Sequence, residues 1–373
     1  MNVLYLINYA GGGGSEKYVY NLIDAYNEKK CECFFAYNED GLLAKQMAKE
    51  KIITFKIEMS SPFDISAAKS LARVCKQNEI DIVHTHYPRE NAIANLAKCY
   101  CKGLKVVYTN HFLTESPFLW KVINKLICAR TDRVIAVCEA SKQLLVKNGY
   151  PKKKIKVIYN GACAPDGGLQ STVRNELGIG DDVFVISTLS RFSSEKRMGF
   201  AVETAKLMKE KTDKKFVFVL AGDGDEFEVV KSKVDEYGLC DYVKCIGYRS
   251  DGANILKGSD AYINCSETEA LSFAIVEALS YENPCVVSAV GGNVEIVNDT
   301  TACGVCCDRD SAEQFADAFI KLMEDKEFYE KCKKGAKESY EKYFSLEKSL
   351  EDTFEVYENV LKSKINKQNN GVM

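Results

Sequence analysis

The sequence predicts an α/β protein with two doubly wound, mostly parallel sheets that follow one another along the chain. Short apolar strands alternate with amphipathic helical stretches up to about residue 300, and one turn-rich segment interrupts this alternation near the middle. Buried strands joined by crossover helices are typical of βαβ units and parallel sheets. The length of 373 residues fits two domains of ordinary size.

The first series of strands and helices occupies the N-terminal half of the chain. Strands are expected at Val3–Asn8, Cys33–Tyr37, Ile52–Phe55, Ile82–His86, Val106–Asn110, Arg133–Val137 and Lys156–Tyr159. Helices are expected between them, for example at Glu16–Glu28, Ile65–Gln77 and Ser141–Asn148. The turn-rich segment from Tyr159 to Gly168 follows and indicates a linker, so we expect the first domain to cover residues 1–163.

A second series begins after the linker. Its strands are expected at Val183–Leu189, Phe216–Gly222, Val243–Gly247, Ala261–Cys265 and Pro284–Ser288. After Gly304 the chain is expected to be helical and charged. We therefore expect the second domain at residues 164–344, followed at 345–373 by a helix that packs back across both domains and frays beyond Ser363.

Composition limits the classes of protein that fit. Apolar residues make up 46% of the chain and the net charge is −3, which indicates a packed globular protein and disfavours nucleic acid as a partner. No apolar run reaches the roughly 20 residues of a membrane span, and the first residues have the pattern of a buried strand, so we expect a cytoplasmic protein. The sixteen cysteines are scattered and are expected to be reduced.

The tightest cysteine cluster is Cys303, Cys306 and Cys307. Only Cys332 follows it and no histidine is near, so a four-ligand zinc site is poorly supplied and we expect no bound metal.

The stretch from Ser266 to Leu279 carries the most chemistry. The expected strand ends at Cys265, a polar loop follows, and an apolar helix starts near Leu271 and Ser272, where free backbone N–H groups suit a diphosphate. A carboxylate accepts hydrogen bonds from two neighbouring hydroxyls, so Glu277 suits a ribose and Glu269 a transferred sugar. From the spacing alone, a surface loop and an ordinary helical glutamate fit equally well.

The Glu269-x7-Glu277 pattern resembles the E-x7-E signature of retaining GT-B glycosyltransferases, especially family four. Further matching runs are Leu220-Ala221-Gly222-Asp223-Gly224, Ile246-Gly247-Tyr248-Arg249-Ser250-Asp251 and Gly291-Gly292-Asn293-Val294-Glu295-Ile296. The likeness extends over nearly the whole chain. It implies the GT-B fold and a nucleotide-sugar donor, UDP-linked or alternatively GDP-linked, which contacts Gly222, Tyr248 and Arg249. Ala270 stands where many relatives have glycine.

Two basic residues after the first strand of the second domain match the family's R-x4-K pattern. Arg191 presents a guanidinium that forks onto phosphate oxygens, and Lys196 adds an ammonium. The pair would do the work of a metal ion. We also expect no Asp-x-Asp motif in a strand-end loop, and therefore no cofactor beyond the donor substrate. A solvated basic loop is the alternative interpretation.

The first domain is expected to hold the acceptor. A glycine run that includes Gly13 and Gly14 opens the first helix, where backbone N–H groups can approach a diphosphate or an acceptor hydroxyl. The dinucleotide-binding fingerprint is incomplete here. By resemblance, His111 matches the family histidine near the reacting carbon of the donor sugar, while His84 and His86 match a stretch whose role varies.

The resemblance implies retention through a front-face departure, with catalysis by positioning and charge stabilisation. Arg191, Lys196, Glu269 and His111 are then the catalytic residues. Two other interpretations are a nucleotide-sugar epimerase on the same fold and a catalytically silent scaffold that binds a partner enzyme.

A basic stretch lies in the first domain. Residues 118–156 hold ten Lys and Arg against two acidic residues, and Phe118–Ile127 would form a helix with apolar and basic faces. Such a helix suits an anionic membrane interface and a lipid-linked acceptor, as in cell-envelope glycan assembly. The same residues would equally form a core helix whose basic edge faces solvent.

Overall fold

The computed structural model describes residues 1–27 and 30–369, with side chains described up to Lys362. The chain divides into two compact units: unit 1 holds residues 1–159 and the chain from Ser349 on, and unit 2 holds residues 160–348. The chain thus passes between the units at Tyr159–Asn160 and Lys348–Ser349, where the sequence analysis expected 163–164 and 344–345.

Unit 1 is built on a seven-stranded sheet in the order β3-β2-β1-β4-β5-β6-β7, and every pairing is parallel. The strands are β1 (Asn2–Tyr9), β2 (Glu32–Glu39), β3 (Ile53–Lys56), β4 (Ile82–Thr85), β5 (Lys105–Asn110), β6 (Arg133–Ala136) and β7 (Ile155–Val157). The order reverses between β1 and β4, which confirms the doubly wound architecture.

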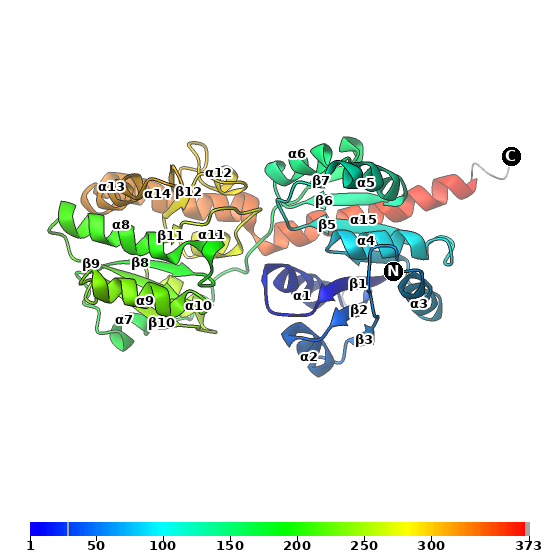
Figure 1. Ribbon diagram of the computed structural model, residues 1–373, viewed down its shortest axis with the longest axis horizontal. Helices are drawn as coiled ribbons and strands as arrows, with labels where there is room; N and C mark the ends of the chain where they lie inside the picture. Colours follow the sequence, from blue (N-terminus) through cyan, green and yellow to red (C-terminus); the bar gives the residue numbers. More distant parts are fainter. Residues whose placement is uncertain (28–29, 370–373) are drawn as a thin grey trace. The chain divides into compact units, whose positions relative to one another are not determined.

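Helices cover both faces of this sheet (Figure 1). They are α1 (Gly14–Tyr26), α2 (Leu42–Lys49), α3 (Ile65–Gln77), α4 (Pro88–Ala97), α5 (Phe118–Arg130) and α6 (Glu139–Lys147). Leu4, Phe34 and Val83 of the sheet pack with Leu71 of α3 and Ile93 of α4 in one buried cluster. The expected end of the first helix, Glu28, lies outside the described residues.

The last helix, α15 (Leu346–Asn369), joins unit 1 from Ser349 on. Tyr357 is fully buried, and its hydroxyl lies 2.6 Å from His84 Nδ1, while Lys156 Nζ lies 2.6 Å from Glu355 Oε2. The backbone of this helix is described to Asn369, and the expected fraying beyond Ser363 stays a prediction. The residues that follow Asn369 lie outside the described part.

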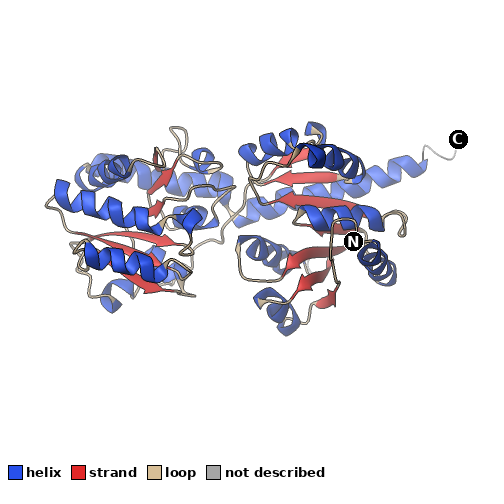
Figure 2. Cartoon of the chain, viewed as in Figure 1, coloured by secondary structure: helices blue, strands red, loops and turns tan. Residues whose placement is uncertain are grey.

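Unit 2 holds a six-stranded parallel sheet in the order β10-β9-β8-β11-β12-β13. The strands are β8 (Phe184–Leu189), β9 (Phe216–Ala221), β10 (Val243–Gly247), β11 (Ala261–Asn264), β12 (Cys285–Ser288) and β13 (Gly304–Cys307). Figure 2 shows the strands of both sheets enclosed by helices. The helices of unit 2 are α7 (Val173–Glu176), α8 (Met198–Lys211), α9 (Phe227–Glu236), α10 (Gly252–Lys257), α11 (Phe273–Ser280), α12 (Asn293–Ile296), α13 (Ala312–Glu324) and α14 (Lys326–Ser339).

Strand β13 corrects the expectation that the chain turns helical directly after Gly304. The cysteines of this run lie in an edge strand that pairs with β12. Gly304 allows the pairing because its φ is +151°, and a Cβ there would lie 1.9 Å from the carbonyl oxygen of Cys285. Cys303, just before the strand, is fully buried, and its thiol donates to the Ile296 carbonyl at 3.2 Å. Within the described chain, no group of three or more His, Cys, Asp or Glu is arranged to hold a metal ion.

Because each sheet is parallel, its strands end at one edge, and the loops that follow them meet there. None of the described helices is both long and apolar enough to cross a membrane.

Candidate active site

The predicted donor-site residues of unit 2 all follow the carboxyl ends of β8, β9, β10 and β11. They are Arg191 and Lys196 after β8, Gly222 after β9, Tyr248 and Arg249 after β10, and Glu269, Leu271, Ser272 and Glu277 after β11. Strands β8 and β11 are neighbours in the sheet, so their loops lie next to each other.

Lys196 and Glu269 form an ion pair between these two loops. Lys196 Nζ lies 2.5 Å from Glu269 Oε1, and the two side chains are 25% and 10% exposed. The Ser266 hydroxyl donates to the same carboxylate oxygen at 2.8 Å. The backbone joins the loops as well, because the Glu267 N–H donates to the Glu195 carbonyl at 2.8 Å. The structure therefore places a cation and a carboxylate together at the carboxyl edge of the sheet.

The N-terminus of α11 follows this pair. Ser272 caps the helix, with its hydroxyl accepting from the Ile275 N–H at 3.5 Å, and Leu271 is buried beneath the turn. Glu277 lies one turn into the helix and is partly exposed. The loop and the helix thus lie where the sequence analysis expected them, and the binding of a diphosphate by the first-turn N–H groups and of a ribose by Glu277 stays a prediction.

The loop after β12 also contacts Glu269. The sequence analysis named it only as the family-like run Gly291–Ile296 and did not assign it to the site. The Gly292 N–H donates to the Glu269 carbonyl at 3.1 Å, and a Cβ on Gly292 would lie 2.0 Å from the Ala270 carbonyl oxygen. The fully buried Asn293 side chain donates to Asn264 Oδ1 at 3.1 Å. The sequence analysis did not identify Asn264, Ser266 or Asn293 as site residues. Ser266 lies three residues before Glu269 and could have been noticed in the same loop, whereas the contact of Asn293 joins two loops distant in the chain.

Gly222 lets the loops after β8 and β9 pack together. Its φ is +147°, and a Cβ would lie 1.8 Å from the Ser190 carbonyl oxygen, while its N–H donates to the Gly247 carbonyl at 2.8 Å. The backbone at this position has no room for any side chain.

We expect Gly222→Ala to lower the free energy of unfolding by about 3–5 kcal/mol, since backbone strain and a backbone clash act together. Gly238→Ala is the matched control, because Gly238 also has a positive φ of +58° but has no atom within 4 Å of the place where a Cβ would lie. The control should lose about 1 kcal/mol. Urea unfolding of both variants checks this, and equal losses would contradict the steric argument.

Tyr248 and Arg249 follow β10. Tyr248 is 75% exposed. Arg249 binds Asp251 in a bidentate pair, with N–O distances of 2.7 and 2.6 Å, and it also contacts Glu176 at 2.9 Å. These hydrogen bonds raise the pKa of Arg249 and lower that of Asp251. In the structure, the Arg249 guanidinium thus binds two carboxylates. A contact between Arg249 and a donor stays a prediction.

Arg191 differs from Lys196. It is exposed, and within the described chain its guanidinium forms no ion pair, while the next residue, Phe192, is fully buried and anchors the loop. Asp223 and Asp225 form an Asp-x-Asp run in the loop after β9, so the expectation that no such motif follows a strand is wrong, and it no longer supports a metal-free site. Both are exposed, and Asp223 Oδ1 accepts from the Gly224 N–H at 2.8 Å.

In unit 1, the three histidines gather where β4 and β5 end. His86 Nδ1 lies 3.2 Å from His111 Nε2, and His84 Nε2 lies 2.7 Å from Thr109 Oγ1. The ring of Tyr18 packs against all three imidazoles. Burial lowers the pKa of His84 and of His111 to about 3 and that of His86 well below its usual range. At neutral pH His111 is therefore a neutral hydrogen-bonding group, held by His86.

The glycine run leads into α1, with Gly13 at the N-cap and Gly14 as the first helical residue. The Glu16 carboxylate lies beside Gly13 and accepts from the Ser15 hydroxyl at 2.9 Å. Ser15 Oγ also lies 2.8 Å from the Tyr87 hydroxyl after β4. This Ser15–Tyr87 contact ties the glycine run to the histidine region and was not predicted.

Glu90 in the first turn of α4 is fully buried, and among the described residues neither carboxylate oxygen has a hydrogen-bond partner. Burial raises its pKa to about 7. A raised folded-state pKa stabilises the protein at low pH, and this stabilisation is lost as pH rises from about 4.5 through 7. Glu90→Gln removes the ionisable group. We expect the resulting gain in the free energy of unfolding to be about 2–3 kcal/mol larger at pH 8 than at pH 4.5, as measured by urea unfolding. An effect independent of pH would contradict the assignment.

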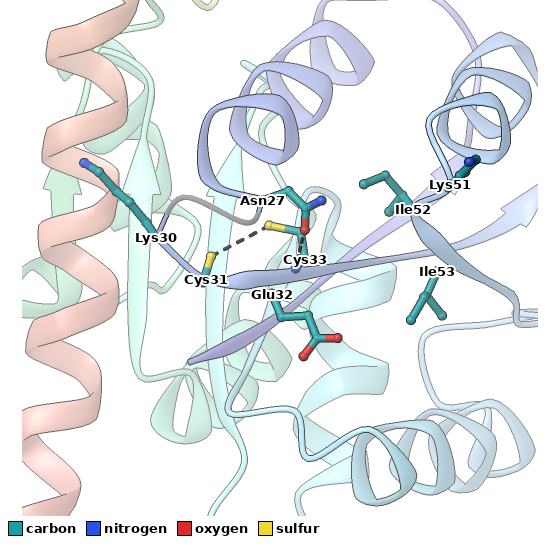
Figure 3. A pocket seen from close by; sticks show the side chains of 8 residues that line it. All are labelled: Asn27, Lys30, Cys31, Glu32, Cys33, Lys51, Ile52 and Ile53. Carbon is teal, nitrogen blue, oxygen red and sulfur yellow. Dashed lines mark hydrogen bonds between the residues drawn. The ribbon is translucent and has the colours of Figure 1, made fainter.

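A hollow of about 560 Å³ lies at the start of β2 (Figure 3). Cys31 Sγ and Cys33 Sγ lie 3.7 Å apart there, and the Cys33 N–H donates to Asn27 Oδ1 at 3.1 Å. The thiol contact lowers the pKa of Cys31 and raises that of Cys33. The described residues that line this hollow include none of the predicted site residues.

The two halves of the chain match known protein families. Residues 170–339 match the family described as Glycosyl transferases group 1, and residues 12–162 match Glycosyltransferase Family 4. The chain is 28% identical over 316 residues to N-acetyl-alpha-D-glucosaminyl L-malate synthase from Bacillus anthracis, covering 81% of this chain and 80% of that protein. It is also 28% identical to UDP-Gal:alpha-D-GlcNAc-diphosphoundecaprenol alpha-1,3-galactosyltransferase from Escherichia coli, covering 70% and 71%.

Solved structures share the fold. A glycosyltransferase from Rickettsia africae ESF-5 aligns with a TM-score of 0.85 and 25% identity, over 97% of this chain and 98% of that one. HepE from Anabaena, solved with UDP, aligns with a TM-score of 0.84 and 19% identity, over 96% and 100%. The solved structures confirm the GT-B fold, and both units match their family models along most of their lengths. The chain is a glycosyltransferase that belongs to family four, the group 1 glycosyltransferases.

Proposed function

We propose that this glycosyltransferase is a retaining, metal-independent enzyme that moves a sugar from a UDP-linked donor to a lipid-linked or glycan acceptor in cell-envelope or exopolysaccharide synthesis. The observation that carries the proposal is the Lys196–Glu269 pair at the carboxyl edge of the second sheet, next to the N-terminus of α11.

The leaving group is a nucleoside diphosphate, so its negative charge needs compensation as the bond to the sugar breaks. Arg191 makes no ion pair with any described residue and is available to fork onto a phosphate. Lys196 follows it in the same loop and is shared with Glu269. The first-turn N–H groups of α11 add a third source of positive potential. Together these groups supply the stabilisation for which other enzymes use a metal ion.

Glu269 fits a positioning role better than that of a nucleophile. One of its oxygens already accepts from Lys196 and Ser266, at 2.5 and 2.8 Å, which holds the carboxylate in a fixed orientation. A carboxylate held in this way can orient sugar hydroxyls. Retention would then follow from departure and attack on the same face of the sugar, with the leaving phosphate oxygen taking the acceptor proton.

The donor base and the acceptor class are proposed from relatives. The E. coli relative is named for UDP-Gal and for a diphosphoundecaprenol-linked acceptor. On this basis we propose a UDP-linked donor, with GDP as the alternative, and an acceptor that carries a lipid.

The test is to incubate the protein with UDP-linked α-sugars and a lipid-linked sugar as acceptor, with and without EDTA, and to follow the new glycosidic bond by NMR. A first product with the α-configuration, formed at the same rate in EDTA, supports the proposal. A β-product, or activity that EDTA abolishes, contradicts it. Conversion of the donor into its epimer without acceptor would instead identify a nucleotide-sugar epimerase, and no turnover at all would favour a silent scaffold.

We also propose that α5 contacts an anionic membrane surface. The helix exposes large apolar side chains, with Phe118 82%, Leu119 68% and Leu126 69% exposed. Lys125 and Arg130 on the same helix are exposed too. Apolar groups ringed by basic ones complement anionic lipid headgroups. Asn124 and Cys128 of the same helix are buried, so α5 packs on unit 1 through one face and exposes the apolar side chains that carry this proposal on another.

The double variant Phe118→Ser/Leu126→Ser is expected to co-sediment with phosphatidylglycerol vesicles at low salt about 10- to 100-fold more weakly than the parent, because it removes two membrane-facing apolar groups. Val229→Ser removes a similarly exposed apolar group (66%) from unit 2 and serves as the control. Failure of the parent protein to co-sediment would refute the membrane contact.

A further inference from the structure

A cavity of about 370 Å³ lies in unit 1 between the ends of β4 and β5 and the helices α5 and α6. This volume is within the usual range for small-ligand sites. Five aromatic rings line it, those of Tyr87, Tyr108, Phe112, Trp120 and Tyr150, together with polar side chains and prolines.

The amide side chains of the wall are already engaged in holding one loop. Asn110 donates to the Phe112 carbonyl at 2.7 Å. Asn148 donates to the Thr114 carbonyl at 3.0 Å and accepts from the Ser116 N–H at 2.8 Å. Because these groups fold residues 112–116 over the cavity, the surface left for a ligand is mainly aromatic and apolar.

The two tyrosine hydroxyls nearest the strand ends are engaged as well. The Tyr108 hydroxyl donates to Asn110 Oδ1 at 2.9 Å, and the Tyr87 hydroxyl lies 2.8 Å from Ser15 Oγ. A sugar ring would need free hydrogen-bonding partners in such a site, whereas an apolar chain would not.

The surroundings indicate a ligand with a charged head. Lys121 pairs with Glu115 at the rim at 2.5 Å, and Lys121, followed by Lys147, lowers the pKa of Glu115. The ion pair places the Lys121 ammonium at the rim, beside the Glu115 carboxylate of the cavity wall. Exposed Phe118 and Leu119 continue the apolar surface outward along α5. An apolar tail with an anionic phosphate matches this combination.

The cavity also adjoins the predicted acceptor region. Tyr87 directly follows His86, and Phe112 directly follows His111, so the residues of the histidine pair lead into the cavity wall. A chain held in the cavity would therefore lie next to the histidines, in the unit expected to bind the acceptor.

We propose that this cavity binds the isoprenoid chain of a lipid-linked phosphate acceptor, close to the phosphate. The assignment rests on the proposed function for its acceptor class. Aromatic ring faces pack well against the methyl branches and double bonds of an isoprenoid, and burial of each additional carbon strengthens the binding.

Trp120, the only tryptophan of the chain, reports on the cavity directly. Its ring stacks on Phe63, with centroids 6.1 Å apart and planes at 9°. Farnesyl phosphate, titrated below its micelle concentration into the full-length protein, is expected to change Trp120 emission saturably and to protect it from acrylamide. Geranyl phosphate, shorter by one isoprene unit, should bind at least about tenfold more weakly, and inorganic phosphate should leave the emission unchanged.

Phe112→Ser and Tyr100→Ser form a matched pair, because both rings are exposed, by 42% and 40%, but only Phe112 lines the cavity. Phe112→Ser should weaken farnesyl phosphate binding about tenfold, and Tyr100→Ser should leave it nearly unchanged. The reverse order would show adsorption to the surface and overturn the proposal. Acrylamide protection in the parent protein keeps the test valid if a variant does not fold.

Dodecyl phosphate separates the two sources of an apolar chain. Binding as tight as that of farnesyl phosphate would point to an acyl lipid and overturn the isoprenoid assignment. Nucleotide binding is measured in the same samples by thermal shift. If UDP stabilises the protein and farnesyl phosphate does not bind, the cavity assignment fails while the transferase proposal stands. If farnesyl phosphate binds and no nucleotide does, the cavity assignment stands and the donor proposal fails.

Discussion

Lys196→Ala is expected to lower kcat about 100- to 1,000-fold, as loss of a preorganised charge at a leaving group does in other enzymes. Lys196 Nζ is fixed 2.5 Å from Glu269 and only 25% exposed, so its charge acts in a partly desolvated site. Its removal also leaves the nearly buried Glu269 carboxylate without its cation. The variant should therefore lose about 1–3 kcal/mol of stability as well.

Steady-state kinetics and urea unfolding of the same preparation separate these two effects. Glu269→Gln tests the partner, since it keeps the shape of the side chain and removes the charge that holds Lys196. Lys257→Ala, an exposed lysine of α10, is the control and should change neither quantity. A Lys196→Ala enzyme that retains more than about a tenth of the parent kcat would exclude a central role for this ammonium.

Arg191→Ala is expected to lower kcat/KM by a similar factor, about 100-fold, but with little change in stability. The reason is that Arg191 is exposed and forms no ion pair with the described residues, so the folded protein loses no internal ion pair. Lys196 and Arg191 thus differ in the predicted stability effect, although both are expected to act on the diphosphate.

Arg191→Lys tests whether activity needs the bidentate hydrogen bonding of a guanidinium or only a positive charge at this position. If bidentate contact is needed, the lysine variant should recover only part of the lost activity. Arg73→Ala, on the exposed face of α3, is the matched control. A loss of stability in Arg191→Ala as large as in Lys196→Ala would contradict the assignment of Arg191 to the substrate.

Most strands could be predicted because buried parallel strands are continuous apolar runs. The run Val3–Asn8 lies within β1, and Val243–Gly247 coincides with β10. Strand β13 was missed, because Gly304–Cys307 is short and its pairing depends on how closely Gly304 approaches Cys285. Only three-dimensional contact shows that glycine is required there.

The candidate site was predicted less completely. The spacing of Glu269 and Glu277 placed one in a loop and one in the helix, as the structure has them. The contacts that orient Glu269 come from Ser266 and Lys196, and the loop carrying it rests on Gly292. Lys196 and Gly292 belong to other βα loops, and nothing in a local pattern reveals that a lysine 73 residues away would meet this carboxylate.

The histidines show the same limit. His84, His86 and His111 were each recognised at a strand end, but their contacts could not be inferred. Tyr357 reaches His84 across 273 residues of sequence, and Tyr18 comes from α1. These contacts bury His84 and His86 and partly bury His111, and burial keeps the three imidazoles neutral, which changes what His111 can do chemically.

A thermal-shift comparison of UDP, GDP and ADP and their common sugars, with and without EDTA, tests the central claim most directly. We predict selective stabilisation by UDP and UDP-sugars, unchanged by EDTA, and about 2.7 kcal/mol in size at a hundredfold excess over Kd. The same ligands should stabilise Lys196→Ala and Arg191→Ala much less. Stabilisation that disappears in EDTA would show that a metal ion takes part, with Asp223 and Asp225 as the first candidates, and no shift with any nucleotide in the folded protein would contradict the donor site itself.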